Sequence, residues 1–128
     1  MHVAIINGQT WLICGGRTFS NQAVFDNAMS DLVEMKGMPA KVVHGGAPGA
    51  DTMAAVWASR HAIECRVEFA DWAKLGRAAG PIRNKKMIDV HKPDLTVAFP
   101  GGRGTSDMIR RAEAAQIDVA HIHISDEP

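Results

Sequence analysis

The sequence predicts one α/β domain, a Rossmann-like, doubly wound and mostly parallel sheet. Three observations carry this prediction. Short apolar segments alternate with longer segments of helical apolar spacing along the 128 residues, and such alternation with short connections is typical of a parallel sheet covered by helices. A chain of this length supports one core but not two of ordinary size. Eight of the twelve glycines fall in three clusters, each directly after an apolar segment.

The N-terminal part predicts two strands and a helix. Residues 2–6 and 10–14 flank an Asn-Gly pair, which favours a tight hairpin, so the first strand is expected as an extra strand at the sheet edge. Ser20 is expected to cap a helix that runs to Met35 and ends at Gly37. The remaining elements are expected as strand 41–44, helix 50–62, strand 65–69, helix 81–91, strand 95–99, helix 106–116 and strand 117–124.

Composition and charge exclude several classes of protein. Hydrophobic residues make up 46% and charged residues 22% of the chain, which excludes a disordered or fibrous protein. Fourteen Lys and Arg balance fourteen Asp and Glu, so no broad electrostatic surface for nucleic acid or an anionic membrane is expected and any anion site must be local.

The first residues lack the basic n-region of a signal peptide, and no apolar stretch approaches the roughly 18 residues of a membrane span. We therefore expect a cytoplasmic protein with no membrane partner.

The cysteines and histidines give little sign of a metal site. Cys14 and Cys65 lie in predicted strands without ligand spacing, as expected for buried thiols in a reducing compartment rather than for a disulfide or a metal centre. Among the six histidines, His121 and His123 share one face of a predicted strand, which leaves a minor metal hypothesis open. We predict no metal and no cofactor.

The three glycine clusters all lie in predicted strand-to-helix loops, where open parallel sheets bind ligands. Glycine lets backbone N–H groups approach an anion, and the following helix adds its dipole; the alternative is that glycine only turns the chain. The strongest cluster is Pro-Gly-Gly-Arg-Gly-Thr at residues 100–105, because it adds the Arg103 guanidinium and the Thr105 hydroxyl. No loop fits the Walker or dinucleotide fingerprints, which argues against ATP hydrolysis and hydride transfer.

The most cationic part of the chain is residues 77–92, with five basic residues and one acid, Asp89. Spacing alone is compatible with a solvated helix face or with an anion-binding surface. Single-stranded DNA binding is a third hypothesis for this stretch. Zero net charge and an aromatic content of 5% without tyrosine argue against a base-stacking platform for DNA.

Four segments combine glycine with polar residues at the predicted loops. They are residues 13–19 (ICGGRTF), 44–51 (HGGAPGAD), 79–87 (AGPIRNKKM) and 99–108 (FPGGRGTSDM). In this order they resemble the four motifs of the YspA/YpsA-related branch of the SLOG superfamily, and the match extends over nearly all of the chain from Trp11 onward. The resemblance implies a Rossmann-like fold and binding of nucleotides or nucleotide-derived ligands, in some members as sensors in bacterial and phage conflict systems.

The same superfamily includes the lonely guy phosphoribohydrolases, which cleave the base from a nucleoside monophosphate, and a DNA-processing protein. The phosphoribohydrolases carry Pro-Gly-Gly-x-Gly-Thr-x-x-Glu and pair that glutamate with an arginine of the preceding helix. Arg83 resembles this arginine, whereas Met108 stands at the glutamate position and cannot handle a proton. Asp107 is one residue away, a step that turns a helical side chain by about 100°. The resemblance therefore supports phosphate binding more than hydrolysis, and by analogy with those dimeric enzymes it suggests a homo-oligomer.

Our leading hypothesis is a single domain over residues 1–128 that binds a nucleotide or a nucleotide-derived phosphorylated ligand, as a sensor. An N-glycosidase acting on a nucleoside 5′-monophosphate is the alternative, with Arg83 and Asp107, or Asp51, as its candidate catalytic residues. In the leading hypothesis the loops hold a phosphate, arginines add charge-assisted hydrogen bonds, and Asn84 and Asp51 recognise the sugar or base. The predicted binding residues are Gly15, Gly16, Arg17, Thr18, Gly45, Gly46, Asp51, Arg83, Asn84, Gly101, Gly102, Arg103, Gly104 and Thr105.

Overall fold

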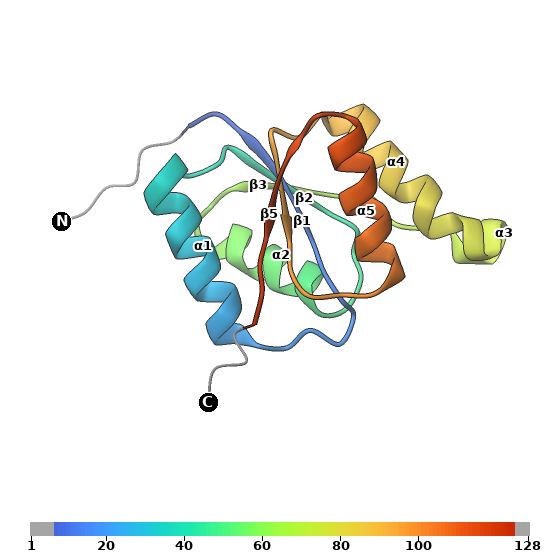
Figure 1. The fold of residues 1–128 in the computed structure, drawn as a ribbon, viewed down its shortest axis with the longest axis horizontal. Coiled ribbons are helices and arrows are strands. Elements are labelled where there is room, and N and C mark those ends of the chain that lie inside the picture. Colours follow the sequence, from blue (N-terminus) through green and yellow to red (C-terminus); the bar gives the residue numbers. More distant parts are fainter. Residues whose placement is uncertain (1–6, 125–128) are drawn as a thin grey trace.

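The computed structural model describes residues 7–124 and contains a five-stranded, all-parallel sheet between two layers of helices (Figure 1). The strand order is β3-β2-β1-β4-β5, so the chain starts in the centre and winds outward in both directions, as in a doubly wound sheet. The predicted fold class is confirmed. The strands are β1 (Thr10–Cys14), β2 (Lys41–His44), β3 (Glu64–Val67), β4 (Leu95–Ala98) and β5 (Asp118–His121).

Two apolar cores lie on the two faces of the sheet. Helices α1 and α2 cover one face, with Phe25, Met29 and Trp57 among the buried side chains, whereas α4 and α5 cover the other with Met87 and Met108. The central strands are buried on both faces, which explains their continuous apolar sequence. The helices are α1 (Gln22–Lys36), α2 (Ala50–Arg60), α3 (Trp72–Leu75), the 3₁₀ turn η1 (Gly76–Ala78), α4 (Ala79–His91) and α5 (Arg103–Ala114).

The predicted N-terminal hairpin is wrong as a pairing for β1. Parallel strands β2 and β4 occupy the two sides of β1, so β1 has no free edge for an antiparallel partner. Asn7 donates instead from its backbone to the Met38 carbonyl at 2.9 Å and from its side chain to the Lys36 carbonyl at 2.9 Å. Gly8 has a positive φ of 74°, which the Asn-Gly pair supplies to any sharp bend and not only to a hairpin. The expected edge strand at 2–6 lies outside the described residues.

Several helices begin at other residues than expected. Asn21, not Ser20, caps α1, because its side chain accepts from the Val24 N–H at 3.1 Å. The segment expected as a loop before α4 forms α3 and η1, and Asp71 caps α3 through the Lys74 N–H. Helix α4 then starts at Ala79, and Pro81 fits its first turn because N–H groups there have no intrahelical acceptor.

Candidate functional site

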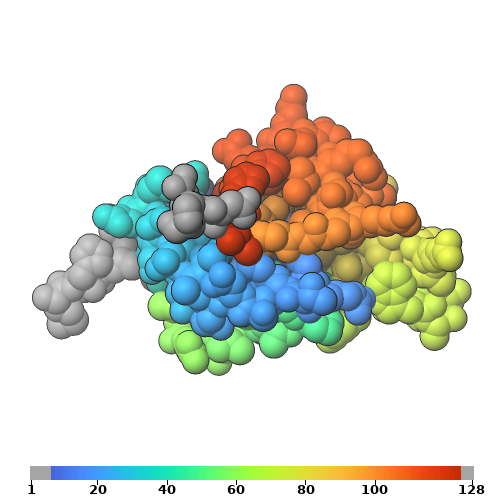
Figure 2. Space-filling view, turned by 60° about the horizontal axis from the view of Figure 1, so that its bottom comes forward, coloured from blue at the N-terminus to red at the C-terminus, as the bar shows by residue number. Residues whose placement is uncertain are grey.

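A cavity of about 1150 Å³ opens at the carboxyl edge of the sheet. The segments that line it meet on one side of the molecule in Figure 2: the β1–α1 loop in blue, the α3–α4 region in yellow-green and the β4–α5 loop in orange. Every predicted binding residue except Gly46 lines this cavity, as does Asp107. The glycine clusters and arginines that are separate in the sequence therefore surround one space, although their role in binding stays a prediction.

The β4–α5 loop presents unused backbone donors to the cavity. Gly102 is the N-cap of α5 and supplies no side-chain acceptor, and the first intrahelical bond runs from the Ser106 N–H to the Gly102 carbonyl at 3.0 Å. The N–H groups of Arg103, Gly104 and Thr105 precede that bond and donate to no residue in the described part of the chain. A helix start with free N–H groups and a positive dipole end is an anion-binding arrangement.

Close packing of the loops requires glycine at Gly101. A Cβ there would lie 2.2 Å from Thr105 Oγ1 and 2.7 Å from the Gly16 nitrogen, so any side chain would push the β4–α5 and β1–α1 loops apart. The two loops are also joined by a hydrogen bond from the Gly16 N–H to the Pro100 carbonyl at 2.9 Å. Added Cβ atoms at Gly102 and Gly104 would meet open space, which leaves the backbone of this loop accessible from the cavity.

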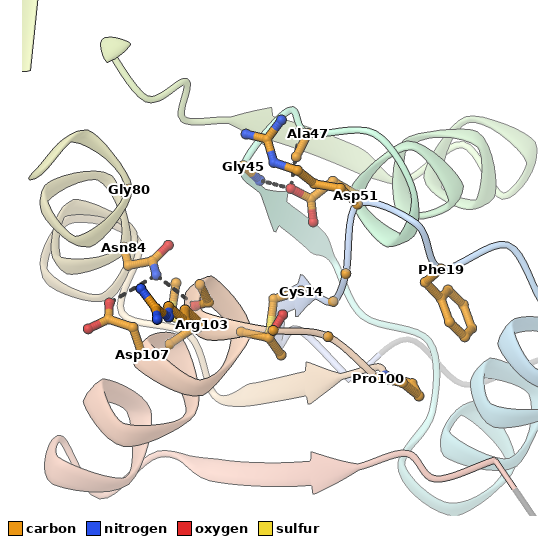
Figure 3. Close-up of a pocket in the computed structure, with 18 of the residues that line it drawn as sticks. Cys14, Phe19, Gly45, Ala47, Asp51, Gly80, Asn84, Pro100, Arg103 and Asp107 are labelled. Atoms are coloured by element: carbon orange, nitrogen blue, oxygen red, sulfur yellow. Dashed lines mark hydrogen bonds between the residues drawn. The ribbon is translucent and has the colours of Figure 1, made fainter. Parts of the chain in front are cut away.

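The first three N–H groups of the β2–α2 loop, those of Gly45, Gly46 and Ala47, have acceptors within the protein. Asp51 Oδ2 accepts from the Gly45 N–H at 3.2 Å and from the Ala47 N–H at 3.1 Å, and His44 Nδ1 accepts from the Gly46 N–H at 3.0 Å. Asp51 is buried, and burial raises its pKa although the Ala47 N–H and the Arg83 charge act against this. The carboxylate of Asp51 thus pairs two N–H groups of the loop before α2, and Figure 3 shows it directed at Gly45 and Ala47.

Arg83 spans the space between α4 and the β2–α2 loop. Its Nη1 donates to the Gly45 carbonyl at 2.7 Å and its Nε donates to Asn84 Oδ1 at 3.0 Å. The side chain is half-buried, and burial lowers the pKa of Arg83 while the nearby Asp51 acts in the opposite direction; an arginine stays protonated in proteins. The Nη2 group makes no hydrogen bond to a described residue and lies on a side chain that lines the cavity.

Asn84 and Asp107 form a buried network under the β4–α5 loop (Figure 3). Asn84 Nδ2 donates to the Gly104 carbonyl at 3.1 Å and to Asp107 Oδ2 at 3.0 Å. Asp107 also accepts from Arg110 Nη2 at 2.6 Å and Arg111 Nε at 2.8 Å. Burial opposes ionisation of Asp107, but the hydrogen bonds from Arg111 and Asn84 lower its pKa overall. Both polar side chains, expected to contact ligand or substrate, are therefore held mainly by the protein.

The cavity floor is apolar. Met108 is buried at 1% exposure and packs with Leu12, Met87 and Ala98, so the glutamate position of the phosphoribohydrolases holds a core side chain here. Cys14 also lines the floor, and burial raises the pKa of this thiol to about 12. The thiol is protonated at neutral pH and is not a nucleophile.

Trp72 and Arg77 also line the cavity, although neither was predicted as a site residue. Trp72 is 48% exposed, and the Arg17 guanidinium carbon lies 5.6 Å from its ring centre. Arg17, Arg77 and Arg103 form no ion pair with any described carboxylate, so none of these three guanidinium groups is held by a direct carboxylate contact within the described chain. The cationic stretch pointed to Arg77, but no spacing signal pointed to Trp72.

Two further findings bear on the sequence predictions. Within residues 7–124, no group of three or more His, Cys, Asp or Glu side chains is placed to hold a metal ion, and the rings of His121 and His123 stack at 6.3 Å. No helix in the same part of the chain is both long enough and apolar enough to cross a membrane.

Comparison with known proteins supports the family resemblance through the first two of its four motifs, residues 13–19 and 44–51. The profile of the YspA, cpYpsA-related SLOG family matches residues 12–75, half of the chain, from β1 to α3. The chain belongs to this SLOG family. The chain is also similar to the Gene 61 protein of Mycobacterium phage D29. The two are 35% identical over 124 residues, which cover 91% of this chain and 97% of the phage protein. No solved structure shows a significant match to this SLOG protein.

Proposed function

We propose that this SLOG protein binds a nucleotide or a nucleotide-derived phosphorylated ligand, with a phosphate at the start of α5. The observation that carries the proposal is the set of three unused N–H groups at Arg103, Gly104 and Thr105, in a loop with no side chain on Gly102 or Gly104. A phosphate group satisfies several such donors at once and matches the positive end of the helix dipole. Family membership supports a nucleotide-related ligand.

The surroundings of that loop suit the same ligand. Arg17 and Arg103 add positive charge without an ion-pair partner among the described residues, and charge-assisted hydrogen bonds are the strong ones in phosphate recognition. A volume of about 1150 Å³ exceeds what inorganic phosphate needs and is of the size of pockets that hold whole small molecules. Binding without turnover suits the sensor role that the family resemblance implies, because Met108 supplies no acid or base.

Isothermal titration calorimetry tests the proposal directly. The probes are the nucleoside 5′-monophosphates, ADP-ribose and cyclic nucleotides, and at least one is expected to bind. Arg103→Gln is expected to weaken that binding about tenfold, the size of a lost charge-assisted hydrogen bond. Arg60→Gln, an exposed arginine at the end of α2 outside the cavity, is the matched control and should leave binding unchanged. No binding by any probe at millimolar concentration would overturn the proposal.

An N-glycosidase is the second candidate, and one observation favours it. Arg83 Nη1 and Asp51 Oδ2 lie on the same side of Gly45, where an added Cβ would be 2.4 Å from the first and 3.1 Å from the second. Asp51 also has a raised pKa, as a general acid requires. Mass spectrometry of nucleoside monophosphates incubated with the protein tests this: hydrolysis would release free base and ribose 5-phosphate. Asp51→Asn keeps the acceptor for the loop N–H groups but not the acid, so it should abolish turnover and leave binding intact. A preparation that binds without releasing base contradicts this second candidate.

A further inference from the structure

Trp72 is placed differently from the two other tryptophans. Trp11 and Trp57 belong to the core, at 0% and 9% exposure, and their rings stack at 6.4 Å. Trp72 is 48% exposed and lines the cavity. A half-exposed indole is costly to leave in water, because the ring carries a large apolar surface. Core packing therefore does not account for the position of Trp72 at the cavity.

The local structure holds this ring at the cavity wall. Asp71 caps the short helix α3, and Gly76 ends it with a positive φ of 57°. The edge of the Trp72 ring rests against Gly80 at the start of α4, where an added Cβ would lie 3.1 Å from Trp72 Cη2. Gly80 is one of the cavity residues labelled in Figure 3. A glycine at this place lets the indole pack directly on the α4 backbone, which fixes one edge of the ring.

Arg17 connects the ring with the proposed phosphate site. Its guanidinium lies 5.6 Å from the ring centre of Trp72, a cation–π distance. The same side chain comes from the β1–α1 loop, whose Gly16 N–H is bonded to the Pro100 carbonyl at the entry of the β4–α5 loop. Trp72, Arg17 and the start of α5 thus line the same cavity, and Arg17 contacts the ring.

We propose that Trp72 is the stacking surface for the nucleobase of the ligand, so that the cavity takes nucleoside phosphates in preference to sugar phosphates. This inference rests on the proposed function and specifies its ligand class. The ring is flat, half-exposed and positioned by Gly80 and Arg17, and every base has a π-face that stacks on an aromatic side chain. The phosphate end is held at α5 and the base end at Trp72.

The test compares ligands with and without a base. Isothermal titration of the full chain uses the four nucleoside 5′-monophosphates and ribose 5-phosphate as the base-free probe. The tightest monophosphate is expected to bind at least about tenfold more tightly than ribose 5-phosphate, which corresponds to one stacked base. Trp72→Ala should remove this difference, and Trp72→Phe should retain most of it. Leu75→Ala, on the same short helix but outside the cavity, is the matched control and should change neither affinity.

Fluorescence gives a second readout. The other two tryptophans are buried, so quenching by a monophosphate should be strong in the wild-type protein and absent in Trp72→Phe. If Trp72→Ala leaves the ratio of monophosphate to ribose 5-phosphate affinity unchanged, the stacking role is overturned while the proposed function stands. If neither ribose 5-phosphate nor any monophosphate, ADP-ribose or cyclic nucleotide binds the wild-type protein, the proposed function and this inference both fail.

Discussion

Two glycine-rich loops follow the strands that flank β1, and they differ in whether their backbone N–H groups have acceptors within the protein. In the β2–α2 loop the N–H groups of Gly45, Gly46 and Ala47 all have acceptors, from the side chains of Asp51 and His44. In the β4–α5 loop the first three N–H groups of α5 donate to no described residue. A glycine cluster before a helix is therefore not by itself an anion site.

The position of the first acidic residue accounts for the difference. Asp51 is the second residue of α2, so its carboxylate reaches back to the loop and accepts from the Gly45 and Ala47 N–H groups. In α5 the first acid is Asp107, the fifth residue, and its carboxylate binds Asn84, Arg110 and Arg111 instead. The start of α5 is left with its donors unpaired within the described chain. The N–H groups of residues 45–47 are thus paired by nearby side chains, whereas those of residues 103–105 have no acceptor in the described chain.

The largest expected effect comes from overpacking the β4–α5 loop. Gly101→Ala places a Cβ against Thr105 Oγ1 and the Gly16 nitrogen, and a backbone atom cannot move aside without separating the loops. We expect a loss of about 1–3 kcal/mol in the free energy of unfolding, the usual cost of overpacking, and loss of nucleotide binding by more than tenfold. Urea denaturation and calorimetry measure the two effects. Wild-type affinity in this variant would show that the β4–α5 loop does not hold the phosphate.

The second prediction concerns the β2–α2 loop, two of whose N–H groups are paired by Asp51. Asp51→Ala leaves the Gly45 and Ala47 N–H groups without their acceptor, and we expect a loss of about 1–3 kcal/mol, the cost of unsatisfied buried donors. Because these loop N–H groups are then unpaired, as the N–H groups of residues 103–105 are, inorganic phosphate should raise the melting temperature of this variant more than that of the wild-type protein. Asp26→Ala, an exposed acid on α1, is the control. Equal phosphate effects in all three proteins would contradict the comparison.

The fold class could be predicted from the sequence because each strand and helix has its own pattern of apolar residues. The apolar runs of β1, β2 and β4 and the helical spacing of α1 and α2 survive in the structure with small shifts at their ends. The hairpin failed because Asn7-Gly8 specifies a bend but not the partner of the next strand, and both sides of β1 are taken by strands far along the chain. Strand pairing is a non-local property that turn chemistry does not determine.

Of the candidate site, only the set of loops that form it could be predicted from the sequence. Parallel topology brings the glycine clusters to one edge, so position along the chain was enough to predict that they converge. Which donors are free depends on side-chain contacts such as Asp51 with Ala47, and motif spacing does not reveal these. Trp72 was not predicted as a cavity residue because its place there depends on contact with Gly80. That contact requires the turn formed by α3 and η1.

The third prediction separates the two acids by pH. The folded-state pKa of Asp51 is raised from 3.8, so its contribution to stability is full below that value and is lost as pH rises through the folded pKa. The folded-state pKa of Asp107 is lowered from 3.8, so its contribution is present above that value and is lost as pH falls. Relative to Asp51→Asn, the wild-type protein should lose stability with rising pH; relative to Asp107→Asn, it should lose stability with falling pH. Urea denaturation of the three proteins from pH 3 to 7 measures both slopes, and slopes of the same sign would contradict the assignment.

The smallest expected effect is the change in the free energy of unfolding when a glycine at the start of α5 is replaced. Gly104 lies in the first turn of α5, and an added Cβ there meets open space at the cavity. Gly104→Ala should therefore raise the free energy of unfolding by about 0.5–1 kcal/mol, because alanine loses less backbone entropy than glycine in a helix. The added methyl group stands beside the N–H donors, so the affinity for nucleotide should fall at the same time. Denaturation and calorimetry on the one variant measure both. A gain in stability with unchanged affinity would mean that the phosphate does not approach Gly104, and the anion site would then have to lie nearer to Arg17.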